Sequence, residues 1–142
     1  MLLGGPEEHE RHQRLIAASQ VLLIDSGCDN PVRHFAAIVA ACSLVVAGDT
    51  LAMHLSLALG RRTIVLFGPT SISEIEMYGL GEKIFPQMEC LACYKNACDF
   101  VPNCMDLISA DTVEAAVERQ LSMISVVPKH GEQPFHLVET RE

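Results

Sequence analysis

The sequence predicts an α/β fold, in which helices cover both faces of a parallel sheet. Short apolar runs alternate with longer segments of helical periodicity, the pattern of parallel strands joined by right-handed crossovers. The runs, for example Leu44–Ala47 and Thr63–Phe67, are continuously apolar, as expected for strands buried on both faces. A polar turn follows each of these two strands. Turns at neighbouring carboxyl ends form the crevice in which open α/β sheets bind ligands.

The first part of the chain is expected to form two strands and two helices. Residues 2–3 read as the end of a strand. Residues 6–20 read as a helix, with proline at its start and glutamates in its first turn. Residues 21–24 are the second strand, and a turn-rich loop follows. The next helix has apolar residues at helical spacing: Phe35, Ile38, Val39 and Cys42.

The second part continues the alternation and then becomes irregular. A strand at 44–47, a helix closed by Gly60 and a strand at 63–67 are expected. Further on we expect a loop or short helix at 71–81, an edge strand at 83–85 and a last helix that begins near Ser109 or Asp111. Residues 1–125 are predicted to be one domain, including a cysteine-rich loop at 88–106, and residues 126–142 a loosely held tail.

Composition restricts the class of function. The chain has 142 residues and a formal net charge of −8, so a nucleic-acid binder, which needs a basic face, is disfavoured. A small phosphate ligand is still allowed, because backbone N–H groups can hold one. Neither a secretory signal nor a membrane-spanning segment is expected, which favours a cytoplasmic location. Clustered cysteines in a reducing cytoplasm indicate metal or redox chemistry more than disulfides.

Several polar residues are expected near the strand ends. Asp49 either caps the helix that follows it or accepts hydrogen bonds from ligand hydroxyls. Thr50 either caps or donates to a phosphate, and His54 lies in the first helical turn, in a structural or a ligand-binding role. The turn Gly68-Pro69-Thr70 lines the same rim. Glu10 reads as a solvated glutamate or as an acceptor for sugar hydroxyls.

Four cysteines follow the pattern C-x2-C-x4-C-x5-C: Cys90, Cys93, Cys98 and Cys104. Four thiolates can hold zinc or iron in a tetrahedral site, although the pattern is not the usual pair of C-x2-C motifs. The alternative is a loop with reduced cysteines. Neither Cys28 nor Cys42 has a histidine and acid arrangement nearby that would indicate a nucleophile.

Taken together, three segments resemble glycosyltransferase family 9, the heptosyltransferases of lipopolysaccharide core biosynthesis and their relatives. They are Gly4-Gly-Pro-Glu7, the stretch from Phe35 to Gly60 that contains Ala-Gly-Asp-Thr, and Leu66-Phe-Gly-Pro-Thr70. The order and spacing match over roughly Leu2 to Leu121. The cysteine-rich stretch also resembles one in this family, and a related group uses cysteines to hold iron.

The resemblance implies a GT-B fold, made of two Rossmann-like domains, of which this chain matches the carboxyl-terminal, donor-binding one. It implies that Asp49 contacts the sugar of a donor such as ADP-heptose, and that Thr50 contacts its diphosphate together with the following backbone amides. It also places His54 beside them, Glu10 at the ribose and Gly68-Pro69-Thr70 along the pocket. The amides are those of Leu51, Ala52 and Met53. The family usually has glycine close after the threonine, and leucine narrows the approach to the backbone here.

The expected function is therefore donor binding in a glycosyltransferase that acts on a lipopolysaccharide-type acceptor. The catalytic base and the acceptor site would belong to the other domain, so no catalytic residue is assigned here and the isolated domain is expected to be inactive. The full-length protein would lie in the cytoplasm or at the periphery of the inner membrane. The alternatives are a catalytically silent binding or assembly module with a structural four-cysteine site, and half of another GT-B-like enzyme such as a sugar-nucleotide epimerase. A dehydrogenase is disfavoured, since no G-x-G-x-x-G motif follows a strand.

Overall fold

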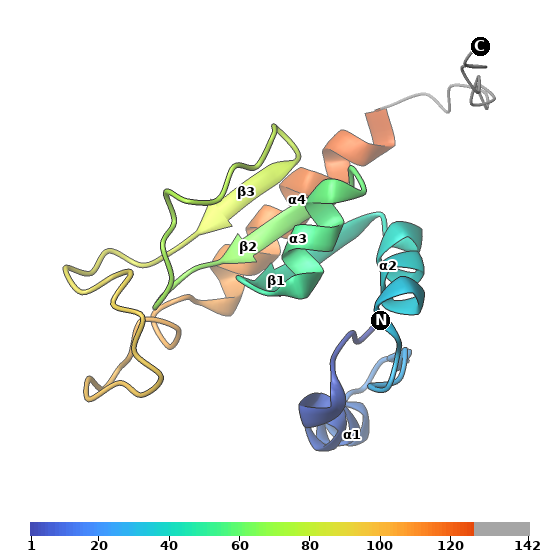
Figure 1. Ribbon diagram of the computed structural model, residues 1–142, viewed down its shortest axis with the longest axis horizontal. Helices are drawn as coiled ribbons and strands as arrows, with labels where there is room; N and C mark the ends of the chain where they lie inside the picture. The colour runs from blue at the N-terminus through green and yellow to red at the C-terminus, as the bar shows by residue number, and fades with distance from the viewer. Residues whose placement is uncertain (127–142) are drawn as a thin grey trace, which may run out of the picture.

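A three-stranded parallel sheet in the order β1-β2-β3 forms the centre of the computed structural model (Figure 1), which describes residues 1–126. The strands are β1 (Leu44–Gly48), β2 (Arg62–Leu66) and β3 (Gly81–Ile84). The helices are η1 (Pro6–Glu8), α1 (His9–Ala18), α2 (Val32–Ala41), α3 (Leu51–Ala58) and α4 (Ala110–Val126). The predicted tail begins inside α4, and its remainder (127–142) lies outside the described residues. None of the described helices is long and apolar enough to cross a bilayer.

Helices cover both faces of this sheet, which confirms the predicted α/β, Rossmann-like class. Helix α3 lies in front of the sheet and α4 behind it in the view of Figure 1. The side chains of β2 alternate between the two layers. Val65 packs with Met53 and Leu57 on the α3 side, and Ile64 packs with Ala116 on the α4 side.

The central strand is held by local chemistry as well as by burial. Thr63 is fully buried, and its hydroxyl is paired with the Ser56 hydroxyl at 2.6 Å and donates to the Arg61 carbonyl at 3.0 Å. These bonds satisfy polar groups that would otherwise destabilise the core. Gly81 pairs with Thr63, and a Cβ at this glycine would overlap the Thr63 carbonyl. Only glycine therefore allows β3 to approach β2 so closely.

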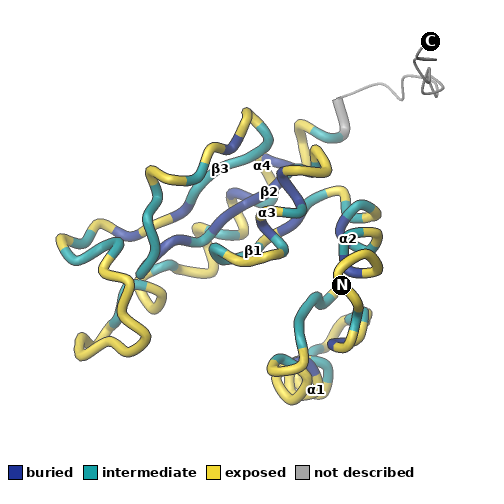
Figure 2. The backbone as a smooth tube through the Cα atoms, viewed as in Figure 1, coloured by how far each residue is buried: buried dark blue, intermediate teal, exposed yellow. Residues whose placement is uncertain are grey.

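The prediction of two further strands was wrong. Residues 2–3 and 21–24 meet through one isolated parallel bridge, Leu2 to Asp25, and do not join the sheet. Two backbone hydrogen bonds hold this bridge, from Leu2 N to Ile24 O and from Ser26 N to Leu2 O. Leu22 is 91% exposed and Val21 71%, so this apolar run gains little from burial. In Figure 2 the amino-terminal segment around α1 is coloured mainly as exposed and intermediate.

An ion pair joins β3 to α4. Glu82 accepts hydrogen bonds from Arg119 at 2.8 Å and from Gln120 at 2.9 Å. The hydrogen bond from Arg119 holds the pKa of Glu82 below its ordinary value of 4.5. A carboxyl group with a lowered pKa stabilises the fold above that ordinary value and loses the effect as the pH falls through its pKa in the folded protein.

We therefore expect Glu82→Gln to lower Tm at pH 7 by roughly 1–4 °C, because partly exposed ion pairs contribute little. The difference from the unchanged protein should shrink as the pH falls below 4.5 and through the lower pKa of the folded carboxyl group. Thermal unfolding monitored by circular dichroism measures it. Glu118→Gln is the control, because Glu118 is an exposed residue of α4. An equal loss of Tm in this variant would mean that net charge, and not the Glu82–Arg119 pair, is responsible.

Candidate functional site

A cavity of about 640 Å³ lies between the amino-terminal segment and β1. The turn Leu3–Pro6 lines it on one side, together with Glu8 and Arg11. Residues 45–48 of β1 and the start of α3 line it on the other. Because β1 is an edge strand of the sheet, the cavity follows the strand's unpaired side. Its volume is in the usual range for small-molecule sites.

The turn after β1 brings backbone and hydroxyl donors to this cavity. Thr50 is the N-cap residue of α3, and its side chain makes no capping hydrogen bond. The first turn of a helix has N–H groups without partners inside the helix, and these carry the positive end of its dipole. Thr50, Leu51 and Ala52 all line the cavity. This arrangement suits an anionic group of a ligand.

Asp49 and His54 lie next to this turn but do not line the cavity. The His54 Nε2 is 3.6 Å from a carboxylate oxygen of Asp49, and the two side chains are 60% and 23% exposed. Asp49 does not cap α3, because Thr50 occupies the N-cap position. Apart from this pairing with His54, its carboxylate can accept hydrogen bonds at the turn. Met53 is fully buried in the core, so only its backbone amide can take part.

The glutamate that lines the cavity is Glu8. Its carboxylate accepts a hydrogen bond from Gly5 N at 2.8 Å. Glu10 is exposed on α1 and does not line the cavity. Arg11 is the one lysine or arginine among the described residues that line the cavity, and Glu8 and Asp29 are the carboxylates that line it. The Arg11 guanidinium makes no hydrogen bond or ion pair with residues 1–126.

The turn Gly68-Pro69-Thr70 lies under the cysteine-rich loop. Gly68 O accepts a hydrogen bond from Ala92 N at 3.1 Å, and Pro69 O accepts one from Tyr94 N at 2.7 Å. A Cβ at Gly68 would lie 2.6 Å from the Cys104 sulfur, so the glycine allows close packing. The turn therefore anchors the loop, and it does not line the described cavity.

The structure does not form the predicted four-cysteine site. Cys90, Cys93, Cys98 and Cys104 are all free thiols. Within residues 1–126, no three of their sulfurs lie within 4.8 Å of one another, whereas a tetrahedral thiolate site requires separations of roughly 3.8 Å. The loop residues around Cys93 and Cys98 are exposed, so packing does not bring these thiols together.

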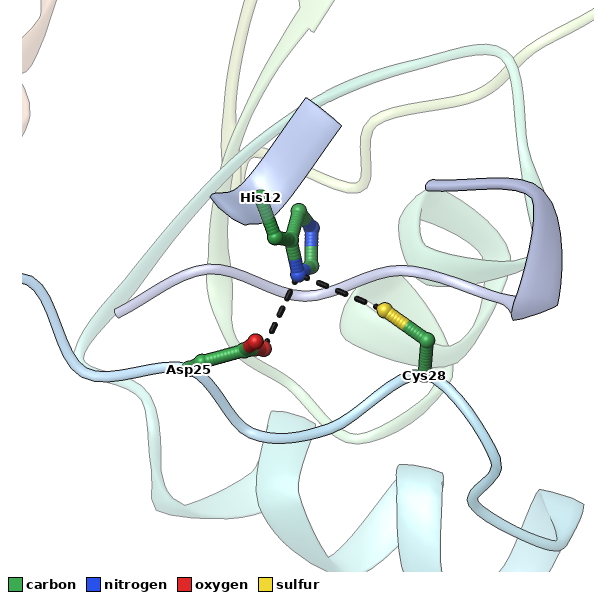
Figure 3. Close-up of side chains that lie close together, drawn as sticks. All are labelled: His12, Asp25 and Cys28. Carbon is green, nitrogen blue, oxygen red and sulfur yellow. Dashed lines mark hydrogen bonds and ion pairs between the residues drawn. The ribbon is translucent and has the colours of Figure 1, made fainter. Parts of the chain in front are cut away.

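A different cluster joins α1 to the loop before α2. His12 Nδ1 lies 2.9 Å from a carboxylate oxygen of Asp25 and 3.4 Å from the sulfur of Cys28 (Figure 3). The hydrogen bonds from His12 and from Gly27 N–H hold the pKa of Asp25 below its ordinary value. Burial, and then the charge of Asp25, raise the pKa of the Cys28 thiol. A histidine and acid arrangement around Cys28 was not predicted from the sequence. Asp25 stands three positions before Cys28, but no local pattern in the sequence links either residue to His12.

The family model described as glycosyltransferase family 9 (heptosyltransferase) matches residues 1–103. The chain belongs to this family. The match extends from the amino-terminal segment through β3 into the cysteine-rich loop. It therefore includes the residues on both sides of the cavity. No curated protein and no solved structure gave a match.

Proposed function

We propose that this chain is the donor-binding domain of a glycosyltransferase, and that it binds a nucleotide sugar such as ADP-heptose in the cavity beside β1. The observation that carries the proposal is the turn at Thr50. The Thr50 hydroxyl makes no capping hydrogen bond, and it lines a cavity of about 640 Å³ together with the first turn of α3 and its backbone amides. Family membership implies a sugar-nucleotide donor, whose diphosphate would match these donors.

The rest of the lining supports the same ligand. Arg11 supplies a positive charge for the diphosphate, and the carboxylates of Glu8 and Asp29 can accept hydrogen bonds from hydroxyl groups. Val32 and Phe35 add an apolar surface on which a base could pack. Asp49 and His54, just outside the cavity, are assigned to the sugar. Glu10 at the ribose and the Gly68–Thr70 turn remain predictions.

The reaction we infer is transfer of a heptose or similar sugar to a lipopolysaccharide-type acceptor in the cytoplasm or at the inner membrane. A base in a second domain would deprotonate the acceptor hydroxyl, which then attacks the anomeric carbon. Here the amides of α3, Thr50 and Arg11 would stabilise the negative charge of the leaving diphosphate. This domain alone should bind the donor without turning it over.

Calorimetric titration with ADP-heptose and with ADP tests the proposal. We expect Thr50→Val to weaken binding roughly 2- to 10-fold, because the variant loses one hydrogen bond to the ligand. Valine and threonine side chains have nearly the same shape, so the cavity should be unchanged. Thr70→Val is the matched control, because Thr70 belongs to the turn outside the cavity. The absence of binding at millimolar ligand would refute donor binding by this chain.

One observation favours a second candidate, a binding or assembly module that has lost its donor. Leu51 is 52% exposed and lines the cavity at a position close to where the family usually has glycine. Its side chain restricts the approach of a diphosphate to the amides. If Leu51→Gly binds ADP and the unchanged protein does not, this second candidate is the correct one.

A further inference from the structure

Three side chains of different chemistry meet at the junction of α1 and the loop that precedes α2. His12 and Cys28 are 4% and 8% exposed, and Asp25 is partly buried. The imidazole nitrogen, the carboxylate oxygen and the sulfur all lie within 4.8 Å of one another. Figure 3 shows the carboxylate and the thiol pointing toward the same edge of the imidazole ring.

The arrangement differs from a catalytic triad. In a triad the nucleophile contacts one ring nitrogen and the acid the other. Here Asp25 and Cys28 both contact Nδ1 of His12. Three donor atoms that converge on one point are the arrangement of a cation site, and the buried thiol is not activated for attack.

The surrounding backbone holds these side chains in place. The bridge between Leu2 and Asp25 fixes the start of the loop. Gly27, with φ of +80°, donates its N–H to the Asp25 carboxylate at 3.0 Å, and Asn30 donates to the carbonyls of residues 26 and 27. On the other side, a Cβ at Gly4 would lie 3.0 Å from the His12 ring. The ring is therefore confined, and its Nδ1 stays directed at the two other donors.

We propose that His12, Asp25 and Cys28 bind a divalent transition-metal ion, for which zinc is the best match. Nitrogen, sulfur and carboxylate oxygen are all zinc ligands, and bonds of about 2.0–2.3 Å at tetrahedral angles place donors roughly 3.3–3.8 Å apart. The two separations from His12 Nδ1, 2.9 Å to the Asp25 oxygen and 3.4 Å to the Cys28 sulfur, are within about 0.5 Å of these values. The third, between the Asp25 oxygen and the Cys28 sulfur, is within 4.8 Å and would shorten when the ion binds. The ion would fasten α1 to the loop whose residue Cys28 also lines the ligand cavity.

The fourth position can be filled from an adjoining cavity of about 490 Å³. Asp25 and Cys28 line this cavity, and so does His9, one helical turn before His12. Water or the His9 ring would complete the tetrahedron. On binding, the Cys28 thiol gives up its proton to solvent and coordinates as thiolate. In the ion-free cluster Nδ1 of His12 carries the proton that it donates to Asp25. On binding, His12 releases that proton to solvent and takes one from solvent on Nε2, so it coordinates through Nδ1 as a neutral ring.

The test uses Co²⁺ and Zn²⁺ with the full, tag-free chain in which the four loop cysteines (90, 93, 98 and 104) are replaced by serine. We expect this protein to bind one Co²⁺ and to show a thiolate-to-cobalt charge-transfer band. Zn²⁺ should displace the cobalt and raise Tm, because it binds only the folded state. The absence of metal binding by this protein would overturn the proposal.

Single changes in the same background locate the site. Cys28→Ser should abolish the charge-transfer band and reduce Zn²⁺ affinity by more than the roughly 10- to 100-fold effect of an outer-shell partner. Cys42→Ser, which removes a half-buried thiol outside the cluster, should change neither. Asp25→Asn keeps the shape of the side chain but removes its charge, and it should also weaken metal binding. If one of the two variants fails to fold, the other still tests the site. Unchanged binding in both would show that the ion sits elsewhere. No nucleotide is present, so the result is independent of the donor-binding proposal.

Discussion

Replacing Arg11 with glutamine is expected to weaken the binding of ADP-heptose roughly 10- to 100-fold, because hydrogen bonds to charged groups contribute about 1.5–3 kcal/mol. The cavity contains two carboxylates, Glu8 and Asp29, and one guanidinium. Without Arg11, a diphosphate would meet only uncharged donors, such as the α3 amides and Thr50, against two negative charges. Calorimetry at fixed ionic strength measures the loss, and added salt should reduce the difference between the two proteins.

Arg14→Gln is the matched control for this change. Arg14 lies on the same helix, carries the same charge and is exposed, but it does not line the cavity. Affinity should stay within about twofold, since an exposed charge outside the site acts only through the screened field of the protein. If both variants bind equally well, the diphosphate does not lie beside Arg11 and the proposed pose is wrong.

The part of the fold that could be predicted is the part in which local signals agree. Leu44–Gly60 combines an apolar run, a polar turn, an apolar helix and a closing glycine, and the structure has β1, α3 and a left-handed Gly60 there. Thr63–Phe67 similarly became β2, shifted by one residue. In each case burial on both faces stabilises what the local pattern favours.

The failures arise where the outcome depends on distant partners. Residues 21–24 have a strand's composition, yet within residues 1–126 this segment pairs only through the isolated bridge to Leu2. A strand becomes stable through a neighbouring strand and a covering layer, and neither is encoded in four residues. The cysteine-rich loop also depends on distant contacts. The spacing of its thiols shows which of them could share a metal ion, but it does not show whether the backbone brings them together.

The candidate site was predictable only in its backbone. A turn after a buried strand locates the helix amides at Thr50, and the structure puts that turn in the cavity. Which glutamate lines the cavity depends on how η1 and α1 are turned toward β1, and in the structure it is Glu8 and not Glu10. The cluster at Cys28 joins residues 13 and 16 positions apart. It depends on the Leu2 bridge, so no local pattern could have shown it.

A matched pair of substitutions is expected to show the largest effect on stability. Leu57→Ala should lower the free energy of unfolding by about 2–5 kcal/mol, since Leu57 is 9% exposed and packs with Met53, Phe67 and Met77. Helix propensity contributes little, because leucine and alanine are both good helix formers. Leu22→Ala should stay within about 0.5 kcal/mol, because Leu22 is 91% exposed.

Urea unfolding measures both free energies, provided that the m-values of the variants equal that of the unchanged protein. The Leu22 result also tests the ligand site. If Leu22→Ala destabilises the protein as much as Leu57→Ala, residues 21–24 are buried in solution and the amino-terminal segment packs as a strand of the sheet. The unpaired side of β1 is where such a strand would add. It also lines the cavity, so pairing there would fill the space assigned to the donor. A small effect at Leu22 therefore supports the open edge of β1 and the cavity beside it.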